Sequence, residues 1–191
     1  MTSQIGQDKF VLEMLKDKRE GVFVDIGGGH PVRINNTHLL ETEYEWSGIS
    51  VDLGPPSAYY CHGLSLHGYR NLWSQERKTP IICGNALHLD YSDLFKQHSL
   101  PATIDYLSVD LHPPSVTYEC LLKVPFSEYK FNVITFETDH YAGSATRDPS
   151  RKYLQEQGYV LVKSLPPVPS EEYPWGPHEE QDDCYVHKSL S

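Results

Sequence analysis

The sequence has no long hydrophobic run and little positive charge. Its 191 residues hold 16 Lys and Arg against 26 Asp and Glu, a net charge of −10. No apolar stretch approaches the roughly 18 residues that span a bilayer, and Gln7, Asp8 and Lys9 interrupt the N-terminus, so no signal peptide is visible. Binding to phosphate backbones needs clustered Lys and Arg. We therefore expect a cytoplasmic protein with no membrane or nucleic-acid partner, and the oligomeric state stays open.

Closely spaced cysteine pairs are also missing. The four cysteines are scattered as Cys61, Cys83, Cys120 and Cys184 and form no C-x-x-C motif. This spacing is typical neither of a zinc site nor of a disulfide scaffold, so we expect free, buried thiols in a reducing compartment. The length predicts one domain, residues 1–191, with a single core.

What the sequence does have is an alternation of strand and helix patterns. Strands are expected at 22–25, 48–52, 81–83, 104–109, 132–136, 159–162 and 184–188. Such alternation predicts an α/β protein whose mainly parallel sheet is covered by helices on both faces. The N-terminal segment, residues 1–20, is predicted to be helical from about residue 8 to residue 19, with Asp8 as its N-cap.

Two stretches interrupt this alternation. Residues 53–80 form a long connection that ends in a predicted helix near residues 69–73. Residues 165–181 are rich in proline and acidic residues and join two expected strands, so we expect a loop there. Long loops in compact domains often act as lids, and Tyr173 and Trp175 make a lid over the site an alternative to a structural loop.

The most informative stretch is Val22-Phe23-Val24-Asp25-Ile26-Gly27-Gly28-Gly29-His30-Pro31. A strand there enters a glycine triplet, which allows a tight turn and close approach of a ligand. A helix expected directly afterwards would offer free N–H groups to a polar ligand group. The strand at 48–52 ends in Asp52, which is placed to hold ribose hydroxyls. Together these features predict an adenosine-type ligand.

The details of the turn separate two kinds of cofactor. A dinucleotide fingerprint needs a third glycine where Val32 stands. Asp25 would repel a pyrophosphate but could attract an amino group. This acid-x-Gly-x-Gly pattern resembles the first motif of S-adenosylmethionine-dependent methyltransferases. A nicotinamide-dependent oxidoreductase or epimerase is the less favoured alternative, and an ordinary glycine-rich turn is the plainest one.

Further motifs follow in chain order: Ser3-Gln4-Ile5-Gly6-Gln7-Asp8, Phe23-Val24-Asp25-Ile26-Gly27, Asn36-Thr37-His38-Leu39-Leu40-Glu41, Trp46-Ser47-Gly48, Ile104-Asp105-Tyr106-Leu107-Ser108-Val109-Asp110 and Val133-Ile134-Thr135-Phe136-Glu137. Together they resemble the FkbM-type methyltransferase family over residues 3–162, and residues 182–187 resemble its closing strand. The resemblance implies a Rossmann-like, doubly wound, seven-stranded sheet with the last strand antiparallel. It also implies S-adenosylmethionine as cofactor and O-methylation of a hydroxyl on a small molecule or sugar.

The sequence departs from the family at two positions. Leu111-His112-Pro113-Pro114 follows Asp110 where the family has x-Glu-Gly, and His30 stands where Asn or Asp is common. The resemblance therefore supports the predicted cofactor-binding residues more than the predicted catalytic residues. A catalytically inactive module that binds an adenosine cofactor is the main alternative.

Ligands of parallel sheets bind at the carboxyl ends of the strands, and the candidate cofactor residues lie there: Asp25, Gly27, Gly28, Gly29, Asp52, Asn85 and Ala86. Asn85 could accept from the adenine amino group, and Asp52 and Asn85 could equally be ordinary turn residues. The family resemblance adds Gln7, with Ser3 and Gln4, near the amino-acid end of the cofactor. Simple helix capping is the alternative for these three.

Two residue sets could activate the acceptor. His112 follows Asp110 at the end of the fourth strand and could act as general base, because histidine is the side chain best suited to take up a proton at neutral pH. Alternatively, Asp110, Asp139 and His140 could hold a divalent cation, Mg²⁺ or Mn²⁺, that activates the hydroxyl. The chain has ten histidines, so a surface histidine without function is the third interpretation of His112.

Overall fold

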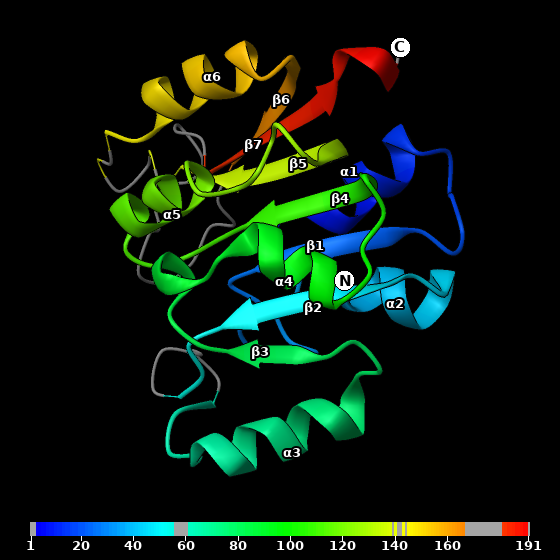
Figure 1. Ribbon diagram of the computed structural model, residues 1–191, viewed down its shortest axis with the longest axis vertical. Coiled ribbons are helices and arrows are strands. Elements are labelled where there is room, and N and C mark those ends of the chain that lie inside the picture. Colours follow the sequence, from blue (N-terminus) through cyan, green and yellow to red (C-terminus); the bar gives the residue numbers. More distant parts are fainter. Residues whose placement is uncertain are drawn as a thin grey trace.

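The computed structural model describes residues 3–55, 61–138, 140, 143, 145–166 and 181–190. Within them, seven strands form one sheet in the order β3-β2-β1-β4-β5-β7-β6 (Figure 1). The strands are β1 (Val22–Ile26), β2 (Ser47–Asp52), β3 (Ile81–Cys83), β4 (Thr103–Val109), β5 (Lys130–Glu137), β6 (Tyr159–Leu165) and β7 (Asp182–His187). The helices are α1 (Gln7–Met14), α2 (His38–Tyr44), α3 (Leu66–Glu76), α4 (Tyr91–Gln97), α5 (Pro114–Leu121) and α6 (Arg147–Glu156).

The strand pairing confirms the expected Rossmann-like sheet. Strands β1 to β5 pair in parallel, and β7 pairs antiparallel with both β5 and β6. All seven expected strands are present, with ends that differ from the prediction by up to three residues. The strand order reverses beside β1, which lies between β2 and β4, so the carboxyl end of β1 marks the switch point where such sheets bind ligands.

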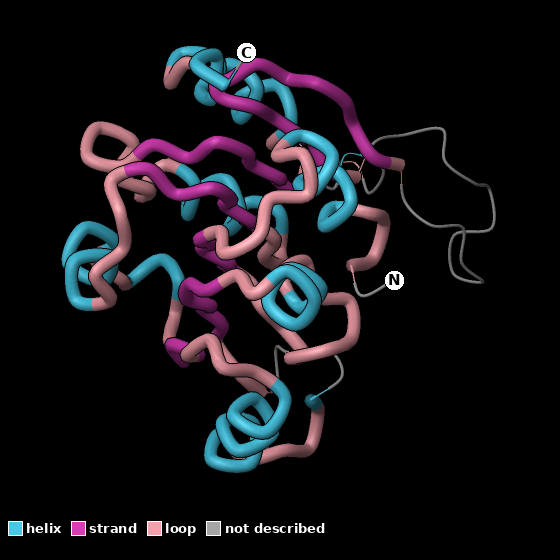
Figure 2. The backbone as a smooth tube through the Cα atoms, turned by 90° about the vertical axis from the view of Figure 1, so that its right-hand side faces the viewer, coloured by secondary structure: helices cyan, strands magenta, loops and turns pink. Residues whose placement is uncertain are grey.

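Helices cover both faces of the sheet (Figure 2). On one face, α4, α5 and α6 bury apolar side chains such as Phe95, Leu121 and Leu154 against the larger core. On the other face, α1 and α2 pack Phe10 and Leu40 against a second cluster, while α3 adds a smaller one. This burial of apolar area is the main favourable term that holds the layers together.

The N-terminal helix is shorter than predicted. It ends at Met14, and Lys16 and Asp17 then adopt left-handed φ values of 53° and 55°, which stop the helix. Asp8 is not its N-cap, since the helix begins at Gln7 with Gly6 in the capping position. Asp8 instead accepts a hydrogen bond from the Ser3 hydroxyl at 2.5 Å.

The helix expected directly after the glycines is also absent. Residues 30–37, which we call the connecting segment, contain no helix, and α2 begins at His38 with only seven residues. Asn35 donates from its side chain to the carbonyl oxygens of Gly28 and His30. Such side-chain bonds to the backbone compete with helical hydrogen bonds, so the prediction of a helix N-terminus at the site was wrong.

The structure also bears on the cysteines, on membrane-spanning helices and on residues 165–181. The four cysteines are free, as predicted, although Cys83 is only half-buried. The described part of the chain has no helix that is both long and apolar enough to cross a bilayer. Residues 165–181 do connect two strands, and the backbone N–H of Gln181 donates to Leu165 across the base of the loop at 2.8 Å. The lid prediction concerns residues 165–181, of which residues 167–180 lie outside the described residues.

Candidate functional site

Two rows of polar residues cross the face of the sheet that α1 and α2 cover. The inner row runs in register from Ser50 through Asp25 and Ser108 to Thr135. Side chains two residues apart on a strand share a face. A second row on the same face therefore lies two residues further along the parallel strands, at their carboxyl ends. This edge row consists of Asp52, Gly27, Asp110, Glu137 and Asp182. Four carboxyl groups and one glycine therefore form a row that passes the switch point and extends from the end of β2 to the start of β7.

The glycine turn, residues 27–29, fits only glycine at its first position. Gly27 has a φ of 99°, and a Cβ there would lie 1.7 Å from the carbonyl oxygen of Asp110. A Cβ on Gly28 would meet the Trp73 ring at 3.1 Å. Gly29 has a left-handed φ of 56°. The turn thus brings the ends of β1 and β4 into backbone contact.

Asp52 joins the glycine turn to the end of β2. One of its carboxylate oxygens accepts from the Gly29 N–H at 2.9 Å and the other from the Gly54 N–H at 2.6 Å. Burial raises the pKa of Asp52, although both backbone hydrogen bonds oppose the rise. A carboxylate has about four acceptor positions, so two remain for a ligand. The role of Asp52 in holding ribose stays a prediction.

Asp25 lies beneath the turn and is only 2% exposed. Its carboxylate accepts from the Thr37 hydroxyl at 3.0 Å. Burial raises the pKa of Asp25 to about 6, against the opposing influence of the Arg77 guanidinium and the Thr37 hydrogen bond. The predicted contact with an amino group of the ligand stays a prediction, since the hydrogen-bond partners of Asp25 in the structure are the Thr37 and Ser108 side chains.

Asp110 and Glu137 form a hydrogen-bonded carboxyl pair at the ends of β4 and β5. Burial raises the pKa of Asp110, while hydrogen bonds from Glu137 and Asn36 lower it. The Asn36 amide also donates to Ser108 at 3.1 Å, which joins this pair to the inner row. A hydrogen bond between two carboxyl groups requires that one of them carries the proton. This pair can therefore take up or release a proton beside the glycine turn.

The other residues predicted for the site lie in different environments. His112 is exposed and makes no hydrogen bond to the described part of the chain. The Asn85 side chain accepts from Leu87 N–H at 2.9 Å, as the turn interpretation predicts, and Ala86 is buried beside it. Gln7 is buried and donates to Asp182 at 2.8 Å. That contact brings the N-terminal segment to the end of the edge row.

Two further sets of predicted site residues are Gln4 in the N-terminal segment and the candidate metal ligands. The Gln4 side chain accepts from Gln181 at 3.2 Å. Asp139, one of the three candidate metal ligands, lies outside the described residues, and His140 lies within them. Among the described residues, no group of three or more His, Cys, Asp or Glu side chains is arranged to hold a metal ion. The cation remains an untested prediction.

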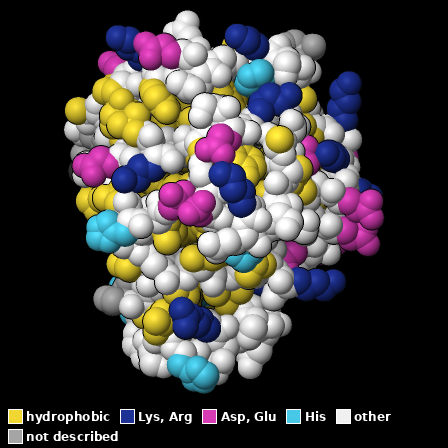
Figure 3. Space-filling model, in the orientation of Figure 1, with side chains coloured by type: hydrophobic (Ala, Val, Ile, Leu, Met, Phe, Trp, Pro, Cys, Tyr) yellow, Lys and Arg dark blue, Asp and Glu magenta, His cyan; other side chains and the backbone are white. Residues whose placement is uncertain are grey.

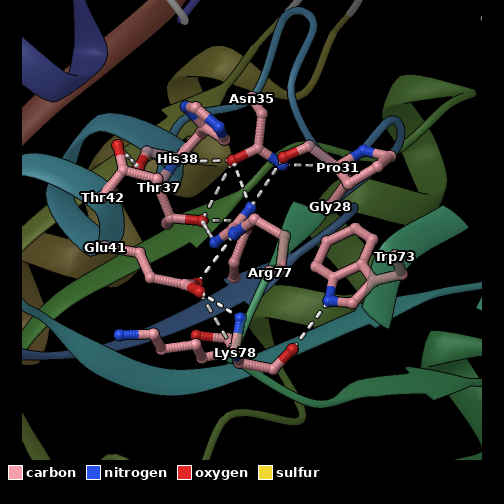
Figure 4. Close-up of polar contacts among 12 residues, drawn as sticks. Gly28, Pro31, Asn35, Thr37, His38, Glu41, Thr42, Trp73, Arg77 and Lys78 are labelled. Carbon is pink, nitrogen blue, oxygen red and sulfur yellow. Dashed lines mark hydrogen bonds and ion pairs between the residues drawn. The ribbon is translucent and has the colours of Figure 1, made fainter. Parts of the chain in front are cut away.

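A buried arginine, Arg77, lies near the turn and was not predicted from the sequence. Arg77 follows α3, and its Nε lies 2.7 Å from Glu41 on α2, with both side chains at most 5% exposed (Figure 4). Its guanidinium lies 5.1 Å from the centre of the Trp73 ring. Glu41 has a lowered pKa because Arg77 and several hydrogen bonds outweigh its burial. A single arginine in a predicted connection carries no local signal, so only the folded chain reveals this contact.

The surface around the sheet carries mixed charge. On the face seen in Figure 3, Lys and Arg side chains lie singly among acidic and apolar ones.

The fold is shared with solved methyltransferase structures. The chain matches no family model and no curated protein. It is similar to the N-methyltransferase NodS from Bradyrhizobium japonicum WM9, with TM-score 0.54, 9% identity and coverage of 95% of this chain and 94% of that one. For the O-methyltransferase NovP the TM-score is 0.54, with 8% identity and coverage of 95% and 78%.

A third similar structure is an S-adenosylmethionine-dependent methyltransferase from Geobacter sulfurreducens in complex with S-adenosyl-L-homocysteine. It has a TM-score of 0.50, 10% identity and coverage of 92% of this chain and 73% of that one. Some of the similar structures are longer: the chain spans 61% of one from Galdieria sulphuraria and 48% of TrmN from Thermus thermophilus. The architecture is thus the Rossmann-like methyltransferase fold.

Proposed function

We propose that this chain is an S-adenosylmethionine-dependent methyltransferase. The edge row of carboxyl groups around Gly27, at the switch point of the sheet, is the observation that carries the proposal. S-adenosylmethionine combines a ribose with two cationic groups, a sulfonium and an ammonium. Carboxylates attract such cations, whereas they repel the pyrophosphate of a nicotinamide dinucleotide. The site therefore favours the methyl donor over the dinucleotide.

The cofactor residues follow from the positions of the strand ends. The glycine turn allows the ligand to approach the backbone, and Asp52 has acceptor positions left for the ribose hydroxyls. Asn85 and Ala86 follow β3 on the adenine side. Gln7 and Asp182 lie at the opposite end of the edge row, where the amino-acid part of the cofactor would extend.

The acceptor in this proposal is a hydroxyl of a small molecule or sugar. This choice rests on the resemblance to FkbM-type sequences, because the similar structures include both the N-methyltransferase NodS and the O-methyltransferase NovP. Methyl transfer to oxygen needs the hydroxyl held in line with the methyl group, and its proton must leave as the bond forms. His112 follows the end of β4 and is exposed, and the proposal assigns to it the uptake of that proton. The Asp110–Glu137 pair is the second proton acceptor in reach of the turn.

Calorimetric titration tests the cofactor assignment. The protein should bind S-adenosyl-L-homocysteine in the micromolar range and show little binding of NAD. Mass spectrometry of any cofactor carried through purification gives an independent result. Preferential binding of NAD would contradict the proposal. Firm binding of S-adenosyl-L-homocysteine with no turnover across a panel of hydroxyl acceptors would favour the inactive cofactor-binding module.

A further inference from the structure

Arg77 is fully buried, and its donors converge on the segment that follows the glycine turn. Besides the Glu41 contact, Nη1 donates to the Pro31 carbonyl at 3.1 Å and to the Asn35 side-chain oxygen at 3.0 Å. Nη2 donates to the Thr37 hydroxyl at 3.0 Å (Figure 4). One side chain that lies 40 residues or more away in the sequence thus binds the connecting segment at three positions.

Asn35 connects Arg77 to the glycine turn. Its oxygen accepts from Arg77 and from the Thr37 N–H, and its nitrogen donates to the Gly28 carbonyl at 2.8 Å and the His30 carbonyl at 3.1 Å. Both polar atoms of the Asn35 side chain are therefore in use. Arg77, Asn35 and Gly28 form a continuous chain of hydrogen bonds from α3 to the turn.

A second branch reaches the acid beneath the turn. The Thr37 hydroxyl accepts from Arg77 and has one proton to donate. The Asn35 oxygen already accepts two N–H groups, so the Thr37 proton is best placed on Asp25, 3.0 Å away. The guanidinium is thus connected to both sides of the turn, the Gly28 carbonyl and the Asp25 carboxylate.

A role in stability alone does not account for this arrangement. Buried ion pairs contribute little net stability, since desolvation offsets their attraction. While Nε pairs with Glu41, Nη1 and Nη2 of Arg77 donate to a segment that has no helix or strand and that includes Ile34 at a left-handed φ of 49°. Without regular secondary structure, the path of this segment depends on side-chain hydrogen bonds.

We propose that Arg77 is a positioning residue for the cofactor, which acts through Asn35 to hold the glycine turn in its ligand-binding shape. The inference rests on the proposed function, because the turn is the expected cofactor contact. It assigns to Arg77 and Asn35 an effect on cofactor affinity that exceeds their effect on folding.

Two conservative variants test the inference. Arg77→Lys keeps the charge beside Glu41 but cannot reach Pro31, Asn35 and Thr37 together. Asn35→Asp keeps the acceptor for Arg77 and removes the donor to Gly28. Binding of S-adenosyl-L-homocysteine is measured by calorimetry well below the melting temperature of each protein. Hydrogen exchange of residues 27–37 is followed in parallel.

We expect at least a tenfold loss of affinity in both variants, with faster exchange confined to residues 27–37. Arg19→Lys is the matched control, because Arg19 forms an exposed ion pair with Glu45; it should bind as the wild type does. Folded variants with an affinity within twofold of that of the wild type would overturn this inference but not the proposed function. Loss of the native fold in both variants would also overturn it, since it would assign the network to stability. Absence of binding by the wild-type protein would overturn the proposed function, and this inference with it.

Discussion

Gly27 lies in backbone contact with Asp110, so close that a Cβ on Gly27 would be 1.7 Å from the Asp110 carbonyl oxygen. The contact joins the ends of β1 and β4 at the switch point of the sheet. It also places the glycine turn beside the carboxyl pair of Asp110 and Glu137. The cofactor side and the acceptor side of the proposed site therefore share one backbone junction.

Gly27→Ala should disrupt this junction. The added methyl group meets a backbone carbonyl that cannot move aside, and alanine is also strained at a φ of 99°. We expect a loss of about 3 kcal/mol or more in unfolding free energy, and no measurable binding of S-adenosyl-L-homocysteine. Gly63→Ala is the control, because Gly63 has a φ of 89° with nothing within 4 Å of the added Cβ. It should lose only about 1–2 kcal/mol from strain, and equal losses in urea titrations would contradict the role of the Asp110 contact.

Asp52→Ala should weaken cofactor binding. The substitution removes the acceptor of the Gly29 N–H and the acceptor positions proposed for the ribose. We expect binding of S-adenosyl-L-homocysteine to weaken by about 1.5–3 kcal/mol in calorimetry. Asp90→Ala is the control, since Asp90 also accepts from a backbone N–H, at the start of α4. Unchanged affinity in Asp52→Ala would contradict the ribose assignment.

Asp25 should make stability depend on pH in an unusual direction. Burial raises its pKa from 3.8 to about 6, so between these values the native state holds a proton that the unfolded state releases. Stability should therefore fall as the pH rises from 4 to 6 and level off above 6, by about 3 kcal/mol from this group. The check is urea unfolding from pH 4 to 8 for the wild type and Asp25→Asn, with Asp148→Asn as an exposed control.

The difference between the wild-type and Asp25→Asn curves isolates this carboxyl group from the others. The side-chain amide of the variant would remain neutral at every pH. The unfolding free energy of the variant should therefore increase relative to that of the wild type as the pH rises. Parallel curves for the two proteins would show that Asp25 titrates in the ordinary range.

The base can be identified once an acceptor is found. If His112 takes the proton, His112→Ala should lower turnover by about 10²–10⁴-fold while binding of S-adenosyl-L-homocysteine stays unchanged. If the carboxyl pair does so, Glu137→Gln should cause the larger loss. His98→Ala, at the end of α4, is the control for loss of a histidine outside the site. Turnover that survives both His112→Ala and Glu137→Gln would exclude both assignments.

The cation hypothesis has its own test. If Asp110, Asp139 and His140 hold Mg²⁺ or Mn²⁺, a chelator should abolish turnover and either ion should restore it. Asp110→Asn combined with Asp139→Asn should then be as damaging as the chelator. Full turnover in excess chelator would contradict a metal requirement and leave proton transfer to the protein side chains.

The sequence alone determined the elements of this fold and their order. Strands are recognisable locally, as short apolar runs with turn residues between them. All seven strands and the mainly parallel arrangement were therefore predicted. The glycine turn and Asp52 were recognisable for the same reason, because each occupies a characteristic place at the end of a strand. Helix ends were less predictable: α1 stops at Met14, and α2 begins only at His38.

Only the tertiary structure decided how the site is held. Arg77 meets Glu41 and Asn35, and Asp110 meets Glu137, across sequence separations of 27 to 42 residues. No periodic pattern records such contacts, because each depends on where two separate elements pack. The same packing sets the pKa of Asp25, since the raised value comes from burial beneath the glycine turn rather than from its neighbours in the sequence.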